Sequence, residues 1–455
     1  MGIRSLSVLD GRYGHLTESF HDIFSEYGLI RYRVYVETRW LRFLLEDLGL
    51  EKASADLLAY IDRIYERFDV NGALAVKEIE SQTNHDVKAV EYYIKRQLSE
   101  AGYAEIGEWV HFACTSDDIN NTAYAMMLRE GRSRLADLLR EVLDRLERLA
   151  KEHKGVPMMS RTHGQPATPT TVGKEFINFA WRIRLETEGL EGLPVAGKMN
   201  GASGNFNAHH FVLPDVDWIG ASKRFLRDYL GLEPLLYTTQ INPSNHLSAM
   251  LHAMVRIAAV LTDLDRDMWG YISLGYFRQK LKEGEVGSST MPHKVNPIDF
   301  ENSEGNMGIA ISIMEHMAVK LLKSRFQRDL SDSTVLRNLG VGFGYMAVGL
   351  RSTLKGLDKL AIHAEQIEKD LRDNLELLAE PVQTAMRLYG EPAPYEKLKA
   401  LTRGRKIIRK DLDDFLGSLE SLPEAVKLRI ADMEPRDYVG LAEKLVENYF
   451  SNDKA

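Results

Sequence analysis

A helical repeat of apolar residues, sustained over several long stretches, constrains the fold of this chain more than any other feature of its sequence. From Leu247 to Tyr271 the apolar residues recur in alternating steps of three and four, which places them along one face of an α-helix. The segment from Ser116 to Lys154 repeats this pattern and would span roughly 50 Å at about 1.5 Å per residue. Further helices are expected at Gly173 to Leu190, Asn302 to Lys323 and Leu336 to Leu350. No stretch shows sustained period-two alternation, so we expect an all-α fold with a central bundle of long helices.

Breaks in the helical pattern divide the chain into three expected domains. Its 455 residues are enough for several domains. We expect an N-terminal helical domain at 1–111, a central long-helix bundle at 112–363 and a C-terminal helical domain at 364–455. The apolar stripes are interpreted as core-packing positions, so chemistry is expected in the loops. The loops rich in Gly, Pro and small polar residues are Gly155–Thr171, Gly192–Pro214, Gly284–Pro297 and Glu380–Pro394.

Charge and cysteine content argue against several classes of function. With 58 Lys and Arg against 66 Asp and Glu, the formal charge is −8, so the chain lacks the basic excess typical of nucleic-acid binding. A single cysteine, Cys114, rules out an intrachain disulfide and a multi-cysteine zinc site, and no cofactor or metal is predicted. Asp10 precedes any apolar run of signal-peptide length, and no membrane-spanning run is visible. We expect a soluble cytoplasmic protein that binds neither nucleic acid nor membranes.

A histidine in a loop with glycine and proline is the first candidate for chemistry. In SRTHGQPATPT, residues 160–170, His163 lies between Thr162 and Gly164. Histidine donates or accepts a proton near neutral pH, and a rigid frame would hold its ring against a ligand. A loop histidine bonded to backbone explains the same pattern.

Two helix starts carry further polar candidates. CTSDDINNT, residues 114–122, predicts a helix capped by Thr115 or Ser116, with acids in the first turn. Its hydroxyls and free N–H groups suit an anionic oxygen, although capping alone is an equal explanation and the acids would oppose an anion unless they point away. TNHDVKAVE pairs His85 with Asp86, which can fix the imidazole tautomer; capping again explains the acid.

The stretch GEVGSSTMPHKVNP, residues 284–297, is the fourth candidate. Its glycines permit unusual backbone conformations, so the N–H groups around Ser288 and Ser289 can converge into an anion-binding nest. Lys294 would add a positive charge. An ordinary surface loop could have the same composition.

These four stretches, in this order between long helices, resemble the fumarase/aspartase/argininosuccinate lyase superfamily. GSSTMPHKVNP is similar to its signature loop, GSSxMPxKxNP. Within the superfamily the chain most resembles the bacterial branch of the adenylosuccinate lyase family, through motifs that run from about residue 9 to about residue 405. These are DGRY, TNHDVKAVEY, HFACTSDDINN, SRTHGQPATP, YTTQI, NPIDFENSEGN and RDLSDSTVLRN.

The resemblance implies a reaction. It is a non-hydrolytic β-elimination of fumarate from adenylosuccinate, giving AMP, and from SAICAR, giving AICAR, in purine nucleotide biosynthesis. Such a reaction needs a base for the proton beside a carboxylate, a site for the aci-carboxylate and an acid for the departing nitrogen. By similarity Ser288 is the general base and His163 the general acid, and Lys294 together with loop closure would make the seryl oxygen basic.

The resemblance also implies substrate-binding residues in three groups. Expected at the nucleotide side are Arg12, Tyr13, Asn84, His85 and Asp86, and at the succinyl carboxylates Thr115, Ser116, Ser289, Lys294 and Asn296. Expected to complete the pocket and hold the phosphate are Gln240, Asn302, Arg328, Ser333 and Arg337. Asn84 stands where many family members have Arg or Lys, so the phosphate must find its positive charge elsewhere. Asp117 stands where Ser is frequent, and Cys114 is unusual, which leaves the role of that helix start open.

Two alternatives remain at this point. A sibling lyase acting on argininosuccinate, aspartate or malate would share the succinyl half, although TNHD and RDLSDSTVLRN favour a nucleotide. A catalytically idle structural protein on the same scaffold, like the lens crystallins of the superfamily, would be expected to lose Ser288, His163 or Lys294, and all three are present. The family further implies a homotetramer in which each site draws loops from three chains.

Overall fold

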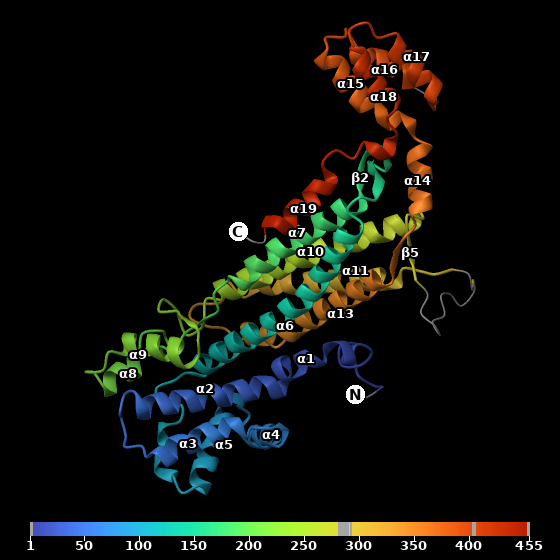
Figure 1. The fold of residues 1–455 in the computed structure, drawn as a ribbon. Coiled ribbons are helices and arrows are strands. Elements are labelled where there is room, and N and C mark those ends of the chain that lie inside the picture. Colours follow the sequence, from blue (N-terminus) through green and yellow to red (C-terminus); the bar gives the residue numbers. More distant parts are fainter. Residues whose placement is uncertain (1–2, 281–290, 292–293, 403–405, 453–455) are drawn as a thin grey trace. The chain divides into compact units, whose positions relative to one another are not determined.

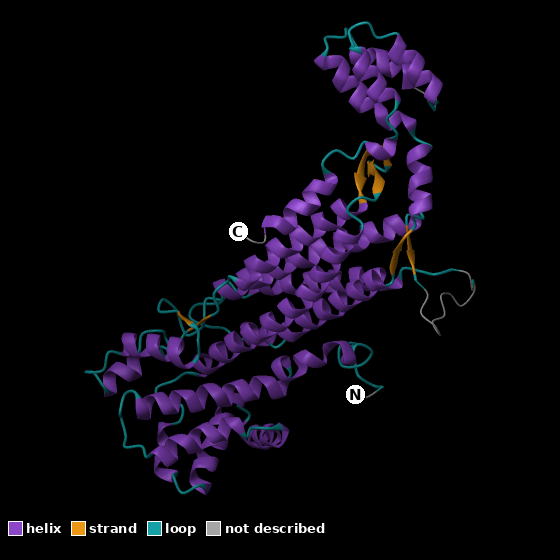
Figure 2. Cartoon of the chain, viewed as in Figure 1, coloured by secondary structure: helices purple, strands orange, loops and turns teal. Residues whose placement is uncertain are grey.

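The expected long helices are present, and the all-α prediction is confirmed. The computed structural model describes residues 3–280, 291, 294–402 and 406–452 (Figure 1). Helices account for 68% of the structure and strands for 5%, and Figure 2 shows the strands only as short pairs. The five predicted helices correspond to α6 (Ser116–Glu152), α7 (Val172–Glu191), α10 (Asn245–Ser273), α11 (Ile298–Lys320) and α13 (Leu339–Asp358).

The chain forms two compact units, and several long helices contribute residues to both. The first unit comprises Met1–Leu139, Leu185–Thr262 and Ser303–Arg351, and the second Arg140–Arg184, Asp263–Asn302 and Ser352–Ala455. The predicted division into domains at 1–111, 112–363 and 364–455 follows chain order instead, and it stays a prediction.

In the first unit, capped helices surround a core of aliphatic side chains. The N-terminal helices are α1 (Gly14–Phe24), α2 (Glu26–Glu46), α3 (Ala55–Glu66), α4 (Val70–Thr83) and α5 (Asp86–Glu100), followed by the 3-10 helix η1 (Ala104–Trp109). The side chains of Ser25, Ser54 and Asp69 cap α2, α3 and α4 by accepting backbone N–H groups, which satisfies donors that a helix start leaves free. Val34, Ile61 and other buried aliphatic residues pack these helices together.

The rest of the first unit consists of short helices and strands joined by loops. The short elements are α8 (Asn207–Val212), α9 (Trp218–Arg224), the π-helix η2 (Phe225–Tyr229), α12 (Ser331–Leu336) and the parallel pair β3 (Ala196–Gly197) and β4 (Glu233–Pro234). Glycines in α13 allow close helix packing: a Cβ at Gly349 would lie 2.5 Å from Cε of Met307, and one at Gly340 would overlap Phe24. Close approach therefore explains glycines that would otherwise weaken a helix.

The second unit contains a β-hairpin and a small C-terminal group of helices. The hairpin is β1 (Pro157–Thr162) with β2 (Gln165–Thr171), and a second antiparallel pair is β5 (Phe277–Gln279) with β6 (Leu360–Ile362). The helical elements are α14 (Ala364–Arg372), η3 (Leu375–Leu378), α15 (Ala379–Leu388), α16 (Pro394–Thr402), α17 (Arg409–Gly417), α18 (Glu424–Ala431), η4 (Pro435–Asp437) and α19 (Ala442–Asn452). Leu378, Val382 and Leu412 belong to the buried core of this group.

The expectation of loops at Gly155–Thr171 and Glu380–Pro394 was wrong. Helix α15 covers most of the second stretch. Most of the first stretch forms the β1–β2 hairpin, with Thr162 paired to Gln165 across a two-residue turn. Prolines at positions 166 and 169 and several polar residues in both strands hide the alternation by which a strand is recognised.

Helix α10 is, within the described residues, the one helix long and apolar enough by length and composition to cross a membrane. Half of the most apolar part of this helix is buried inside the protein. A core helix of a protein in water has the same character, so this is weak evidence for a membrane segment.

Candidate active site

The start of α6 is built around a buried carboxylate. Asp118 Oδ1 lies 2.9 Å from Lys198 Nζ, and both side chains are 0% exposed. Asp118 Oδ2 accepts hydrogen bonds from the backbone N–H groups of Thr115 at 2.9 Å and Gly201 at 3.1 Å. The acid thus points inward and is paired with a cation, so it does not oppose an anion at the half-buried Thr115 and Ser116. The predicted helix start, with acids in its first turn, is confirmed.

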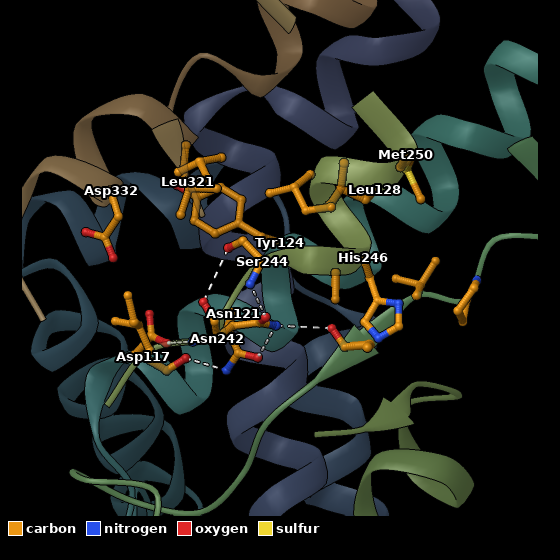
Figure 3. Close-up of a pocket in the computed structure, with 17 residues that line it drawn as sticks. Asp117, Asn121, Tyr124, Leu128, Asn242, Ser244, His246, Met250, Leu321 and Asp332 are labelled. Carbon is orange, nitrogen blue, oxygen red and sulfur yellow. Dashed lines mark hydrogen bonds between the residues drawn. The ribbon is translucent and has the colours of Figure 1, made fainter. Parts of the chain in front are cut away.

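Asp117, in the same turn, faces a cavity. Its Oδ2 accepts a hydrogen bond from the backbone N–H of Asn242 at 3.2 Å. Asn121, His246 and Asp332 line the same cavity of about 50 Å³, and Figure 3 shows their side chains gathered around it. Asp117 therefore connects α6 to the loop that precedes α10.

Burial raises the pKa of Asp117 to about 7. The charges of Lys198 and Arg328 oppose this shift, whereas Asp118 and Asp332 add to it. A carboxyl group of this kind changes its charge near neutral pH, so the charge beside Thr115 and Ser116 depends on pH.

Asn242 fixes the loop that carries Gln240. Its side-chain amide donates to Asn121 Oδ1 and to the carbonyl of Ala196, both at 3.3 Å, and its Oδ1 accepts the N–H of Ser244 at 2.9 Å. These bonds are drawn in Figure 3. The loop is thereby held in one conformation through side-chain contacts to α6.

Gln240 and Arg328, both predicted site residues, lie together. Gln240 Nε2 donates to the carbonyl of Ala202 at 3.1 Å, and Arg328 Nη1 donates to Gln240 Oε1 at 3.3 Å. The amide orients the guanidinium, which suits recognition of an anionic group.

Asp86 is held between two arginines. Arg33 Nη2 lies 2.7 Å and Arg337 Nη2 2.9 Å from Asp86 Oδ2. Arg33 Nε also donates to Asn120 on α6 at 2.8 Å. Burial alone would raise the pKa of Asp86, but the two arginines lower it to about 2. The structure thus brings Asp86 and Arg337 together, and Arg337 stays 45% exposed.

His85 and Asn84 have local structural roles. His85 Nδ1 accepts the backbone N–H of Lys88 at 3.1 Å, which caps α5, and lies 4.0 Å from Asp86 Oδ1. The closer partners of Asp86 are the arginines rather than the imidazole. Asn84 ends α4 in the left-handed conformation, with φ 50°, which asparagine adopts more readily than arginine or lysine. Asparagine therefore suits the backbone conformation at this position.

The remaining described site residues have their own local contacts. The Arg12 guanidinium lies over the ring of Tyr13, 5.9 Å from its centroid. The backbone N–H of Ser333 donates to Asp332 Oδ1 at 2.6 Å, and Asn302 Nδ2 donates to Ser352 Oγ at 2.8 Å. Lys294 is exposed and Asn296 half-buried, whereas Ser288 and Ser289 lie outside the described residues.

His163 occupies the tip of the β1–β2 hairpin. His163 and Gly164 form its two-residue turn, with φ angles of 53° and 75°. Positive φ at both positions is what a type I′ turn requires, and it is unusual for histidine. The side chain is exposed, so the structure presents an imidazole outward on a short, fixed turn.

The described site residues at the start of α6, around Gln240 and around Asp86 suit an anionic ligand. Among residues 3–280, 291, 294–402 and 406–452, no three His, Cys, Asp or Glu side chains gather as a candidate metal site. The groups present are guanidinium donors, hydroxyls and a helix N-terminus, which bind carboxylates and phosphates.

Comparisons with known proteins agree with this arrangement. Residues 11–314 match the family described as Lyase, and residues 324–439 match the family described as Adenylosuccinate lyase C-terminal. The adenylosuccinate lyase of Vibrio cholerae is 47% identical over 450 residues, and that of Escherichia coli 46%, each covering 98% of both chains. The chain belongs to the adenylosuccinate lyase family.

Solved structures show how widely the fold of this family is shared. A fumarate lyase from Mesorhizobium superposes with a TM-score of 0.78 over 95% of this chain and 97% of its own. The 3-carboxy-cis,cis-muconate lactonizing enzyme of Pseudomonas putida gives 0.77 over 96% of this chain and 97% of its own. Both are 19% identical, so they support the fold alone.

Sequence reasoning missed three residues that organise this family member's site. Arg33, Lys198 and Asn242 each bond to a residue of a predicted motif. A signal existed in the sequence for Arg33, because it lies among the apolar residues of α2, and the structure buries it with 3% exposed. The pairing of Lys198 with Asp118 spans 80 positions and left no local pattern.

Proposed function

We propose that this protein catalyses the adenylosuccinate lyase reaction. It would eliminate fumarate from adenylosuccinate to give AMP, and from SAICAR to give AICAR, in purine nucleotide biosynthesis. The observation that carries this proposal is the identity of 46–47% over 98% of both chains to two bacterial enzymes of that name.

The described contacts support roles for the binding residues. Arg328 and Arg337 are oriented by Gln240 and Asp86, which suits them to the phosphate, and Arg12, Tyr13, Asn84 and His85 complete the nucleotide side. Thr115 and Ser116 lie at the N-terminus of α6, where an incoming carboxylate meets hydroxyls and N–H groups. By their place in the motifs, Ser289, Lys294 and Asn296 would also bind the succinyl carboxylates. Asn302 and Ser333 would complete the pocket that holds the phosphate.

The elimination moves one proton to a base and one from an acid. In this proposal Ser288 takes the proton from the succinyl carbon beside the carboxylate, and the electrons of that C–H bond form the double bond of fumarate. The C–N bond breaks, and His163 donates a proton to the departing nitrogen. The exposed hairpin tip supports His163 as a group presented to a ligand, and the role of Ser288 rests on the motif.

We propose a cytoplasmic homotetramer with active sites shared among three subunits. Large apolar side chains remain exposed on the long helices, among them Trp181 (54%), Leu185 (51%) and Trp269 (48%). Exposed apolar surface of this kind is typical of interfaces between copies. Sedimentation should give a tetramer, and an active monomer would contradict it. Inactive His163→Ala and Ser288→Ala variants should regain activity when their subunits are mixed and exchanged.

Turnover monitored by ultraviolet absorbance tests the reaction itself. Adenylosuccinate should be consumed with formation of AMP and fumarate. Consumption of argininosuccinate or malate, with adenylosuccinate left intact, would assign the protein to a sibling lyase.

A further inference from the structure

The hairpin that carries His163 needs outside support to hold its tip in one place. A two-stranded hairpin alone is marginally stable in water, and its two-residue turn is exposed. A proton donor that shifts by about 1 Å can lose roughly a hundredfold in rate. The residues that brace the strands are therefore candidates for a role in the reaction.

Asp370 on α14 is the centre of such a brace. Asp370 Oδ2 accepts a hydrogen bond from the Tyr276 hydroxyl at 2.9 Å and lies 3.3 Å from Nη2 of Arg161. Gln366 Nε2 donates to its other oxygen, Oδ1, at 3.1 Å. Arg161 belongs to β1 and lies two residues before His163, so this network joins α14 directly to the strand that leads into the turn.

The surroundings make this network rigid. Tyr276 is 0% exposed, and the Arg161 guanidinium lies over its ring, 6.0 Å from the centroid. Burial and the hydrogen bond to Asp370 raise the pKa of Tyr276 to about 12, so the hydroxyl remains a donor. If Asp370 were lost, a buried hydroxyl and a guanidinium would both lose their acceptor.

Other contacts hold the hairpin farther from its tip. Thr168 on β2 donates to Glu380, and Lys154, before β1, lies 2.9 Å from Glu443 Oε1 of α19. These contacts fix the base and the return strand. Among the described contacts, the Asp370–Arg161 pair is the side-chain link to β1 next to the turn.

We propose that Asp370 is a positioning residue for His163. By holding Arg161 and Tyr276 it fixes the direction of β1 and hence the place of the imidazole. This inference rests on the proposed role of His163 as general acid.

The test uses Asp370→Ala, with Asp373→Ala as the matched control. Asp373 lies at the end of the same helix, 4.0 Å from Lys369 and half-exposed. We expect Asp370→Ala to lower kcat for adenylosuccinate about ten- to a hundredfold with KM changed less than about threefold, while the control keeps both. Asp370→Asn retains one oxygen acceptor and should recover part of kcat. If Asp370→Ala does not fold, Tyr276→Phe, which removes one bond to Asp370, replaces it.

A double variant separates positioning from general damage. If Asp370 acts through His163, adding Asp370→Ala to His163→Ala should reduce the residual rate less than about twofold. The inference would be overturned if Asp370→Ala lowered the rate by the same factor in the wild-type protein and in His163→Ala. It would also be overturned if kcat were unchanged in Asp370→Ala. A normal rate in His163→Ala alone would instead overturn the proposed acid.

Discussion

The start of α6 and the tip of the β1–β2 hairpin both carry residues proposed to act on substrate, but the chain holds them by different means. At α6, Asp118 and Lys198 form a pair with 0% exposure that also binds backbone N–H groups. At the hairpin, His163 is exposed, and its nearest brace is the partly exposed Asp370–Arg161 pair. The proposed carboxylate-binding part is thus built into a core, whereas the proposed acid is presented from a turn. Stability and catalysis should therefore respond separately to mutations in the two regions.

The largest expected effect is on catalysis alone. We expect His163→Ala to lower kcat by about 10²- to 10⁴-fold, because the proposed proton donor is lost, while the free energy of unfolding changes by less than about 0.5 kcal/mol at this exposed position. Steady-state kinetics and urea unfolding would measure both, with the exposed His210→Ala as control. A large loss of stability in His163→Ala would show that the hairpin tip also contributes to folding.

At the start of α6 the expected effect is on folding. Asp118→Ala leaves Lys198 as an unpaired buried cation and should lower the free energy of unfolding by about 3–5 kcal/mol. The double variant Asp118→Leu/Lys198→Met removes both charges and should recover part of that loss. Urea unfolding monitored by circular dichroism measures the difference. A cost below about 1 kcal/mol for Asp118→Ala would mean that this pair does not organise the region.

The two regions also differ in what the sequence could predict. The period of the apolar residues located α10 at Leu247 to Tyr271, against Asn245–Ser273 in the structure, because a long helix repeats its signal many times. The two strands of the hairpin are only six and seven residues long, and β2 contains prolines, so an alternating pattern of apolar residues has little length in which to repeat. The motif placed Asp118 in the first turn of α6, yet its inward direction depends on Lys198, far along the chain. Local pattern thus predicts elements and helix starts, and long-range pairing decides which way their side chains point.

The first unit also contains two groups, His209 on α8 and Asp117 on α6, whose titrations affect stability in opposite directions. The ring of His209 packs against Trp218 at 4.8 Å between centroids, and neither ring nitrogen has a hydrogen-bond partner among the described residues. Burial lowers the pKa of His209 from 6.5 to about 4, whereas burial raises that of Asp117 from 3.8 to about 7. The stability linked to His209 is lost as pH falls from 6.5 towards 4, and that linked to Asp117 is lost as pH rises from 3.8 towards 7.

In the wild-type protein these two slopes should largely cancel between about pH 4 and 6.5. Asp117→Asn should expose the His209 slope, so that the free energy of unfolding falls with falling pH by up to about 1.4 kcal/mol per pH unit. In His209→Phe only the titration of Asp117 remains, so the free energy of unfolding should fall as pH rises. Urea unfolding at several pH values tests both variants, and slopes of the same sign would show that one of the two shifts is absent.

The smallest expected effect concerns substrate affinity. As pH rises through about 7, Asp117 gains a negative charge beside Thr115 and Ser116, where the succinyl carboxylates are proposed to bind. We therefore expect KM for adenylosuccinate to rise about two- to fivefold between roughly pH 6 and 8, and Asp117→Asn to flatten that rise. Asp56→Asn is the matched control, because Asp56 is an exposed first-turn acid of α3. The kcat profile, which reports the acid and base in the bound complex, should keep its shape in Asp117→Asn. A KM that still rises equally in Asp117→Asn would place the responsible group elsewhere and limit Asp117 to holding Asn242.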